Sequence, residues 1–352
     1  MKPQKSFRGR GTQHNPQSRF KSTEYVHEPL WSDDLEEPSP KTQFIPDNTK
    51  EIFAWNDSPD IGFDVSINPY RGCEHGCVYC YARPFHEYLD FSSGIDFETK
   101  ILVKENAPAL VRKGLQKKSW EPQVVAISGI TDPYQPVERK LELTRGCLEV
   151  FRDFRNPIGI VTKNHLVTRD IDILSEMSEY NTAKVMISLT TLDRSLTEVM
   201  EPRTSRPERR LAAIRTLSEA GIPVGVLIAP IVPGLTDREI PELIAAAKDA
   251  GAEHVSFVML RLPNSLVELF TTWLDEHYPD AKSKVLGRIQ QMRGGNLYDS
   301  RFGVRGRGEG VYAEHIHTLF KSACKKHGIP QSGKPLSTEH FRNPYENQLS
   351  MF

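Results

Sequence analysis

The chain has 352 residues, of which 38% are hydrophobic and 26% charged, a composition that can bury a large core and is ordinary for an α/β enzyme. Its 45 lysines and arginines nearly balance 46 aspartates and glutamates, so the net charge of -1 creates no overall basic field for nucleic acid or a membrane surface. No apolar run reaches the roughly 20 residues of a membrane helix, and the N-terminus lacks the apolar segment of a signal peptide. We therefore expect a cytoplasmic protein with no membrane partner.

Residues 1–55 are rich in Pro, Gly, Ser, Gln and charged residues without apolar periodicity, which predicts a disordered N-terminal arm. The early stretch FRGRGTQHNPQSRF is basic. It is either a solvated tail or an arm that covers nucleic acid or substrate.

Residues 56–265 alternate short β-branched runs with helical segments, which is typical of parallel βαβ units. The expected strands are 63–67, 124–128, 158–162, 185–190, 224–229 and 255–260, with 100–103 at an edge. Pro207 and Gly221 bound one helix, and Thr236 with Glu239 forms a capping-box pattern before the next. Six units predict an α/β fold, a partial (β/α)6 TIM-like barrel, whose chemistry lies on loops after the carboxyl ends of the strands.

Residues 266–328 predict a helical C-terminal extension, with helices over 266–277, 282–292 and 311–327. Between the second and third helices, four arginines alternate with aromatic residues; these are Arg293, Arg301, Arg305, Arg307, Tyr298 and Phe302. This segment is either a flap over the barrel mouth or a surface that follows phosphates and stacks bases. Residues 329–352 predict a flexible tail.

Three of the five cysteines lie within eight residues, in NPYRGCEHGCVYCYAR. Thiolates of Cys73, Cys77 and Cys80 on one tight loop can bind three irons of a cubane cluster and leave the fourth iron open. A zinc site normally has a second ligand pair, and none follows here. Zinc and a purely structural trio are the alternatives to an iron-sulfur centre. Cys147 and Cys324 stand alone, so the cysteines form no disulfide framework.

The spacing C-x3-C-x-aromatic-C after the first strand of a six-unit barrel resembles the radical S-adenosylmethionine (SAM) superfamily over residues 60–265. The segments NPYRGCEHGCVYCYARP, TDPYQPVE, MEPR and GIPVGVLIAPIVPGL are further similar to the PA0069-like (Rv2578c-like) radical SAM proteins, and more distantly to spore photoproduct lyase. The resemblance implies an enzyme with a [4Fe-4S] cluster that cleaves SAM to a 5'-deoxyadenosyl radical, which abstracts hydrogen from a substrate. It also implies a reductant such as flavodoxin or ferredoxin.

The resemblance places SAM contacts at the strand ends. Tyr79 and Tyr81 flank Cys80 and can lie against the adenine, and Tyr81 is also a candidate catalytic residue. Lys163 offers an ammonium to the SAM carboxylate, as an alternative to a surface salt bridge. The complete set of candidate SAM-binding residues is Tyr79, Ser128, Gly129, Thr131, Asp132, Lys163, Ser188, Arg203 and Pro230.

The resemblance to spore photoproduct lyase stops at one loop. That enzyme uses a cysteine hydrogen donor after its second strand, where this chain has Ser128, Gly129 and Ile130. Either a tyrosine, Tyr81 or Tyr134, quenches the radical, or SAM is consumed. The substrate is then a nucleic-acid lesion in DNA repair, or alternatively RNA, a protein or a metabolite. An electron-transfer or structural iron-sulfur adaptor is the non-enzymatic alternative.

The last five residues, QLSMF, resemble the peptide by which bacterial DNA polymerases and repair proteins dock on the sliding clamp. Leu349, Met351 and Phe352 can fill an apolar groove, while Gln348 makes directional hydrogen bonds beside Ser350. We expect the bacterial sliding clamp as a partner, with a chance match or a tail packed on its own domain as the alternatives.

Overall fold

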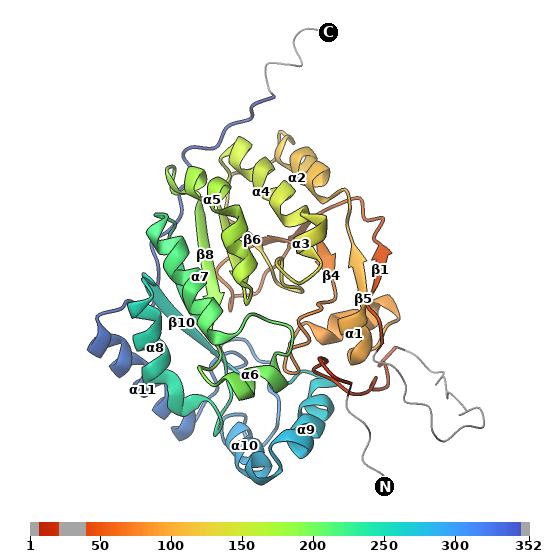
Figure 1. The fold of residues 1–352 in the computed structure, drawn as a ribbon, viewed down its shortest axis with the longest axis vertical. Coiled ribbons are helices and arrows are strands. Elements are labelled where there is room, and N and C mark those ends of the chain that lie inside the picture. Colours follow the sequence, from red (N-terminus) through yellow and green to blue (C-terminus); the bar gives the residue numbers. More distant parts are fainter. Residues whose placement is uncertain (1–6, 21–39, 346–352) are drawn as a thin grey trace, which may run out of the picture.

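The computed structural model describes residues 7–20 and 40–345 (Figure 1). Its main feature is a seven-stranded sheet in the order β10-β9-β8-β7-β6-β3-β2. These strands are β2 (Phe53–Trp55), β3 (Val65–Ile67), β6 (Val125–Ile127), β7 (Ile158–Thr162), β8 (Ala183–Ser188), β9 (Val224–Ile231) and β10 (His254–Met259). The six strands from β3 to β10 are parallel, and only β2 pairs antiparallel, with β3. The predicted partial (β/α)6 barrel is confirmed.

The helices lie around the outside of the parallel strands (Figure 1). They are α2 (Ala107–Leu115), α3 (Glu138–Leu141), α4 (Leu143–Phe154), α5 (Ile171–Ser178), α6 (Arg194–Met200), α7 (Pro207–Glu219) and α8 (Ile240–Asp249). Strand residues alternate accordingly: Ile158 and Ile160 are buried in the main apolar core, whereas Gly159 and Val161 are only partly buried. The apolar core therefore fills the space between strands and helices, and the alternate strand positions point into the barrel.

Strand register brings two of the candidate residues together. Thr162 of β7 lies opposite Ile187 of β8. The next residues, Lys163 and Ser188, therefore lie side by side on the inner face at the carboxyl ends of the two strands, because side chains alternate along a strand.

A second, three-stranded sheet has the order β1-β5-β4, with β1 at Gln43–Pro46, β4 at Tyr70–Arg71 and β5 at Lys100–Val103. β1 and β2 both fall within the range expected to be a disordered arm, which differs from the sequence prediction. The physical reason is long-range pairing: β1 pairs with β5, and the Phe53 ring packs 4.7 Å from that of Trp120. The cysteine loop follows β4, so it begins between the two sheets.

The predicted helical extension is confirmed, as α9 (Leu266–His277), α10 (Pro279–Gln291) and α11 (Val311–His327). Buried Arg293 donates to the carbonyls of Leu260, Val304 and Arg305, so the Arg- and Gly-rich segment is folded against the end of β10. None of the helices in the described ranges is long and apolar enough to cross a membrane.

The expected capping box at Thr236 is wrong. The Thr236 hydroxyl accepts from the backbone N–H of Val232 at 2.9 Å, and the Glu239 carboxylate accepts from Thr191 and from the N–H of Leu192. A 3-10 turn, η3 (Asp237–Glu239), precedes α8 instead. Tertiary partners thus compete successfully for both side chains.

His86, in the 3-10 helix η1 (Arg83–Leu89), is buried between the rings of Phe91 and Phe97. Burial lowers its pKa from 6.5 to about 4. Below pH 6.5 the unfolded chain binds a proton that the folded chain does not, so stability is lost as the pH falls toward 4. Between pH 7 and pH 5 this amounts to about 2 kcal/mol.

We therefore predict that His86→Phe in the cluster-free protein reduces the loss of unfolding free energy between pH 7 and pH 5 by about 2 kcal/mol. Urea denaturation at both pH values measures it. The control is His315→Phe, at an exposed position of α11. Equal pH dependence in His86→Phe and the parent protein would contradict the assignment.

Candidate iron-sulfur and SAM site

The three cysteines lie on the loop between β4 and η1. Cys73 and Cys77 are buried and Cys80 is partly buried. Burial raises the pKa of Cys73 and Cys77 well above the usual value, and each also feels the negative charge that Cys80 would carry. Without a cation the thiols stay protonated; a bound metal would displace these protons, because thiolates are the ligands. The donor set therefore fits a metal centre held by sulfur.

Across residues 7–20 and 40–345, no group of three His, Cys, Asp or Glu side chains is already arranged to hold a metal ion. The donor set is three thiols on one loop, and a cubane cluster binds each of its thiolates through a different iron. Zinc, which normally takes four ligands, stays the alternative.

A buried ion pair fixes one side of this loop. The side chains of Arg83 and Glu98 are both 0% exposed, and Arg83 Nη2 lies 2.6 Å from Glu98 Oε1. Glu98 belongs to α1 (Ile95–Thr99). The remaining guanidinium nitrogens of Arg83 donate to the carbonyls of Cys77, Ser93 and Gly94 at 2.9–3.1 Å. The backbone at the second cysteine is thereby tied to α1.

The N-terminal segment 7–20 packs on the same pair. Glu98 accepts hydrogen bonds from the N–H groups of Gly11 and Thr12, both at 3.0 Å, and from the Thr12 hydroxyl at 2.9 Å. A Cβ on Gly11 would lie 1.6 Å from the carbonyl oxygen of Gly76, between the first and second cysteines. The segment thus lies in direct contact with the cysteine loop.

The opposite side of the loop is held by residues after β6. The Thr131 hydroxyl donates to the carbonyl of Gly72 at 2.6 Å. Glu74 accepts from the N–H of Val137 at 2.8 Å and from Arg203 at 3.1 Å. Two predicted SAM ligands, Thr131 and Arg203, therefore have side chains that contact the cysteine loop itself.

His75, inside the cysteine motif, links the loop to the end of β7. Its Nδ1 lies 3.3 Å from Asp132, and its Nε2 lies 3.2 Å from the amide of Asn164. Asp132 also accepts from the N–H of Lys163 and from Thr162. Burial alone would raise the pKa of Asp132, but His75 and these hydrogen bonds bring it below the usual value. Asp132 therefore acts on the strand end as a fixed carboxylate.

Lys163 points into the barrel. Its ammonium donates to the carbonyl of Ala229 at 3.0 Å and to Thr190 at 3.2 Å, and lies 3.2 Å from Glu201. Burial, followed by the nearby charge of Arg210, lowers its pKa to about 8. The ammonium is therefore still mostly protonated at neutral pH.

Glu201 is the buried carboxylate at the centre of this group. It accepts from Thr190 at 2.7 Å and from the hydroxyl of Tyr79, and it pairs with Arg210. Burial raises its pKa despite Arg210. The Tyr79 ring lies below the Lys163 ammonium, with 5.5 Å between the nitrogen and the ring centroid. Tyr79 is thus held inside the barrel by its hydroxyl.

The remaining predicted residues line the end of the barrel. Ser128 donates to the carbonyl of Thr131, and Gly129 has a φ of 130°, which a residue with a side chain rarely adopts. Tyr81 is 43% exposed; its hydroxyl donates to the carbonyl of Gly129 at 2.8 Å, and the Arg261 guanidinium lies 4.3 Å from its ring centroid. Ser188 is buried at the end of β8, and Pro230 lies in β9 next to Ala229.

Tyr134, one of the two candidate radical quenchers, and Cys147 are not at this site. Tyr134 is fully buried in the main core, and its hydroxyl donates to Asp170 at 3.0 Å. Cys147 is also in that core, within α4, and burial raises its pKa strongly. Of the two candidate tyrosines, Tyr81 and Tyr134, Tyr81 is the exposed one.

Sequence reasoning missed Arg83, Glu98 and the Glu201–Arg210 pair. Arg203, predicted as a SAM ligand, contacts Glu74 in the cysteine loop. The local sequence carried no signal for Glu98, because it lies in α1 within DFETKI, where most residues are polar.

These features define a parallel α/β barrel with three thiols, two buried and one partly buried, on a loop at its mouth. Residues 67–247 match the model of the radical SAM superfamily. The chain belongs to the radical SAM superfamily, whose members are enzymes that use a [4Fe-4S] cluster and SAM.

Relatives and solved structures agree with this family. The chain is 37% identical over 226 residues to the uncharacterized protein Rv2578c of Mycobacterium tuberculosis, covering 64% of this chain and 66% of that protein, slightly less than two thirds of its length. It is 31% identical to the uncharacterized protein MJ0683 of Methanocaldococcus jannaschii, covering 62% and 78%. A mutant of spore photoproduct lyase superposes with a TM-score of 0.59 at 18% identity, covering 81% of this chain and 78% of that one. At this identity the superposition shows a shared fold.

The contact between Gly11 and Gly76 generates a prediction. Gly11→Ala places a methyl group against backbone that cannot move without displacing the cysteine loop, so we expect segment 7–20 to detach. Arg10, which now donates to the carbonyls of Glu98 and Pro40, then becomes accessible. Limited trypsin digestion should cleave after Arg10 about tenfold faster than in the parent protein.

The control is Gly62→Ala, because a Cβ at Gly62 meets nothing within 4 Å. Equal cleavage rates for Gly11→Ala and Gly62→Ala would show that the segment does not depend on this contact.

Proposed function

We propose that this chain binds a [4Fe-4S] cluster through Cys73, Cys77 and Cys80 and reductively cleaves SAM. The observation that carries the proposal is the set of three thiols, two of them buried, on a loop fixed at the mouth of the barrel, inside the segment that matches the superfamily. When bound, the cluster supplies the electron that cleaves SAM to a 5'-deoxyadenosyl radical. The chain's own residues hold the thiols, bind SAM and limit access of water.

Lys163 is the proposed partner of the SAM carboxylate. Its ammonium lies at the inner end of β7 beside Ser188, and it can exchange its present contacts with Thr190 and Glu201 for a carboxylate ligand. Charge-assisted hydrogen bonds of this type are the strong ones. Ser128 and Gly129 border the same opening, and the missing side chain of Gly129 permits close approach to a ligand.

Tyr79 and Pro230 are proposed to lie along the adenosine part of SAM. Pro230 follows Ala229, whose carbonyl accepts a hydrogen bond from the Lys163 ammonium. The Tyr79 ring lies below the same ammonium. For Thr131, Asp132 and Arg203 we propose positioning roles, because their side chains contact the cysteine loop or the end of β7.

We propose a nucleic acid as the substrate. Two exposed aromatic rings that stack with partly buried arginines support this: Tyr81 with Arg261, and Phe302, which is 57% exposed, with Arg305, which also pairs with Asp60. Such stacks can accept bases and phosphates together. One solved structure of spore photoproduct lyase, similar in fold, is a complex with a dinucleoside spore photoproduct. The alternatives stay RNA, a protein or a metabolite as substrate, and an iron-sulfur adaptor without catalysis.

Tyr81 is the proposed hydrogen donor to the substrate radical. The loop after β6 offers no thiol, and Cys147 is in the core, so a cysteine relay is absent from the described part of this site. The Tyr81 hydroxyl, bonded to the carbonyl of Gly129, faces the opening. DNA repair is the cellular role that this proposal favours.

The catalytic unit is proposed to be residues 56–265, with 1–55, 266–328 and 329–352 as arm, helical extension and tail. A flavodoxin or ferredoxin is the proposed reductant. The sliding-clamp peptide, residues 348–352, lies outside the described residues. Docking on the clamp stays a proposal based on the sequence QLSMF; clamp capture that is equal with and without these five residues would contradict it.

Replacement of a single cluster ligand tests the metal site. After anaerobic reconstitution, Cys73→Ala should lose most of the bound iron and at least 100-fold of the 5'-deoxyadenosine formed with dithionite and SAM. The control Cys324→Ala removes a buried thiol in α11 and should keep both. Full iron content and unchanged 5'-deoxyadenosine in Cys73→Ala would contradict the proposed ligands.

Removal of the ammonium tests the SAM site separately. Lys163→Met should retain the iron but raise the SAM concentration for half-maximal cleavage by about 10- to 100-fold, as expected for loss of a hydrogen bond to a charged group. Lys248→Met, on the exposed face of α8, serves as the control. An unchanged SAM dependence in Lys163→Met would place the carboxylate elsewhere.

The substrate class is tested by isotope transfer. We expect deuterium from an oligonucleotide with perdeuterated thymidine to appear in 5'-deoxyadenosine above the level in solvent controls. We also expect Tyr81→Phe to lower the formation of the nucleic-acid product at least tenfold. Absence of transfer, with SAM cleavage intact, would exclude this nucleic acid as the hydrogen source.

A further inference from the structure

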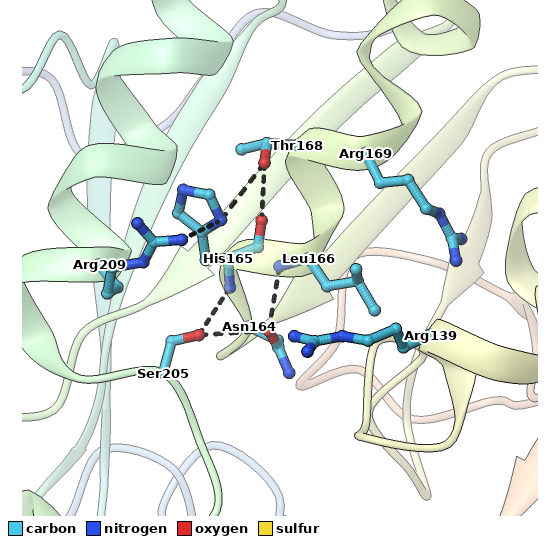
Figure 2. A pocket seen from close by; sticks show the side chains of 8 residues that line it. All are labelled: Arg139, Asn164, His165, Leu166, Thr168, Arg169, Ser205 and Arg209. Carbon is cyan, nitrogen blue, oxygen red and sulfur yellow. Dashed lines mark hydrogen bonds between the residues drawn. The ribbon is translucent and has the colours of Figure 1, made fainter.

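A second pocket lies beside the cysteine loop and belongs to none of the residues proposed for SAM. It is bordered by α3, by the 3-10 helix η2 (His165–Asp170) and by the start of α7, and it has a volume of about 280 Å³ (Figure 2). Its polar lining includes Arg139, Arg169, Arg209, His165, Asn164 and Ser205. Sequence reasoning singled out none of these residues as a site.

The pocket is positively charged because, of its three arginines, only Arg169 is paired with carboxylates. Arg169 pairs with Glu138 at 2.9 Å and with Asp170 at 2.8 Å. In contrast, the side chains of Arg139 and Arg209 contact no carboxylate in the described part of the chain. Arg209 Nη2 lies 3.4 Å from His165 Nδ1. No Asp or Glu lines the pocket. Two exposed guanidinium groups thus border a cavity without a counter-charge.

The directions of the side chains make these charges converge. Arg139 extends from α3 toward the turn at Asn164 and Leu166, and Arg209 extends from α7 toward His165 (Figure 2). If His165 Nδ1 accepts from Arg209, the ring proton is on Nε2, so His165 is a further donor. Burial and Arg209 both lower the pKa of His165, in keeping with a positive local field.

Internal hydrogen bonds fix the floor of the pocket. Ser205 accepts from the N–H of His165 at 2.8 Å and donates to Asn164 at 3.2 Å. The same side-chain oxygen, Asn164 Oδ1, also accepts from the N–H of Leu166 at 3.0 Å. The turn after β7 is therefore held in place without any ligand, so the arginines meet a preformed surface.

We propose that this pocket binds a phosphate group, as free phosphate or as a phosphate ester. Guanidinium groups from separate helices suit a multiply charged oxyanion, because each can direct two N–H groups at its oxygens. The volume exceeds that of bare phosphate and approaches the lower end of the roughly 300–1,000 Å³ found for small-molecule sites. A monoester or one nucleotide phosphate therefore fits better than a halide.

The pocket is separate from the SAM site but shares a strand end with it. Lys163 points into the barrel, while Asn164 and His165 line the pocket on the other side of the same turn. The Asn164 amide also contacts His75 within the cysteine motif. The inference goes beyond the proposed function, and phosphate binding does not require SAM cleavage.

Isothermal titration with inorganic phosphate at low ionic strength tests the proposal on the full-length protein. We expect one site whose affinity falls at least tenfold in Arg139→Gln/Arg209→Gln. The matched control is Arg206→Gln/Arg215→Gln, which removes the same amount of positive charge. Both residues are exposed and lie in or next to α7, but neither lines the pocket. The control should stay within twofold of the parent protein.

A second titration, with a short single-stranded oligonucleotide, distinguishes the sources of phosphate. Displacement of inorganic phosphate by the oligonucleotide, lost in the Arg139/Arg209 variant, supports a nucleic-acid phosphate; phosphate binding without displacement supports a small phosphorylated ligand. Equal losses in both double variants, or no binding by the parent protein, would overturn the proposal. Because no step needs iron or SAM, either result is independent of the catalytic proposal.

Discussion

The buried pair of Arg83 and Glu98 is the interaction on which the cysteine loop depends. Removing two charges from water is costly, and the pair is tolerated because every side of it is satisfied. Arg83 donates to three backbone carbonyls, and Glu98 accepts three hydrogen bonds from Gly11 and Thr12. Loss of either charge would leave the other buried without a partner, at a cost of about 3–5 kcal/mol. The pair therefore joins the N-terminal segment, α1 and the loop into one unit.

A second buried group organises the inside of the barrel. Glu201 lies between two cations, Arg210 and Lys163, and accepts from Thr190 and Tyr79. Arg210 satisfies the carboxylate from the side of α7, so the Lys163 ammonium can transfer to another carboxylate without leaving Glu201 unpaired. The site is thus preorganised for an anionic ligand at the end of β7, which is where the superfamily's cofactor is proposed to bind.

The sequence predicted the elements that depend on local pattern. The six parallel strands, the strand 100–103 and the helices 266–277 and 311–327 were predictable because alternation and helical periodicity are local signals. The expected edge position of 100–103 was wrong, because β5 lies between β1 and β4. The cysteine spacing likewise indicated the metal loop. Interactions between residues far apart in the chain were not predictable: β1 needs β5, and Gly11 contacts Gly76, which lies 65 positions further along the chain. A basic, glycine-rich segment shows no periodicity even where it packs closely.

The same limit applies to the site. Position at a strand end correctly brought Lys163 and Ser188 together, but it could not tell which side chains face a ligand and which hold the loop, as Thr131 and Arg203 do. The central claim is that three thiols leave an open iron for SAM. Electron paramagnetic resonance of the reconstituted, dithionite-reduced protein tests this most directly. We predict a [4Fe-4S]+ signal whose g values change when SAM is added; an identical spectrum with saturating SAM and full iron content would contradict the account.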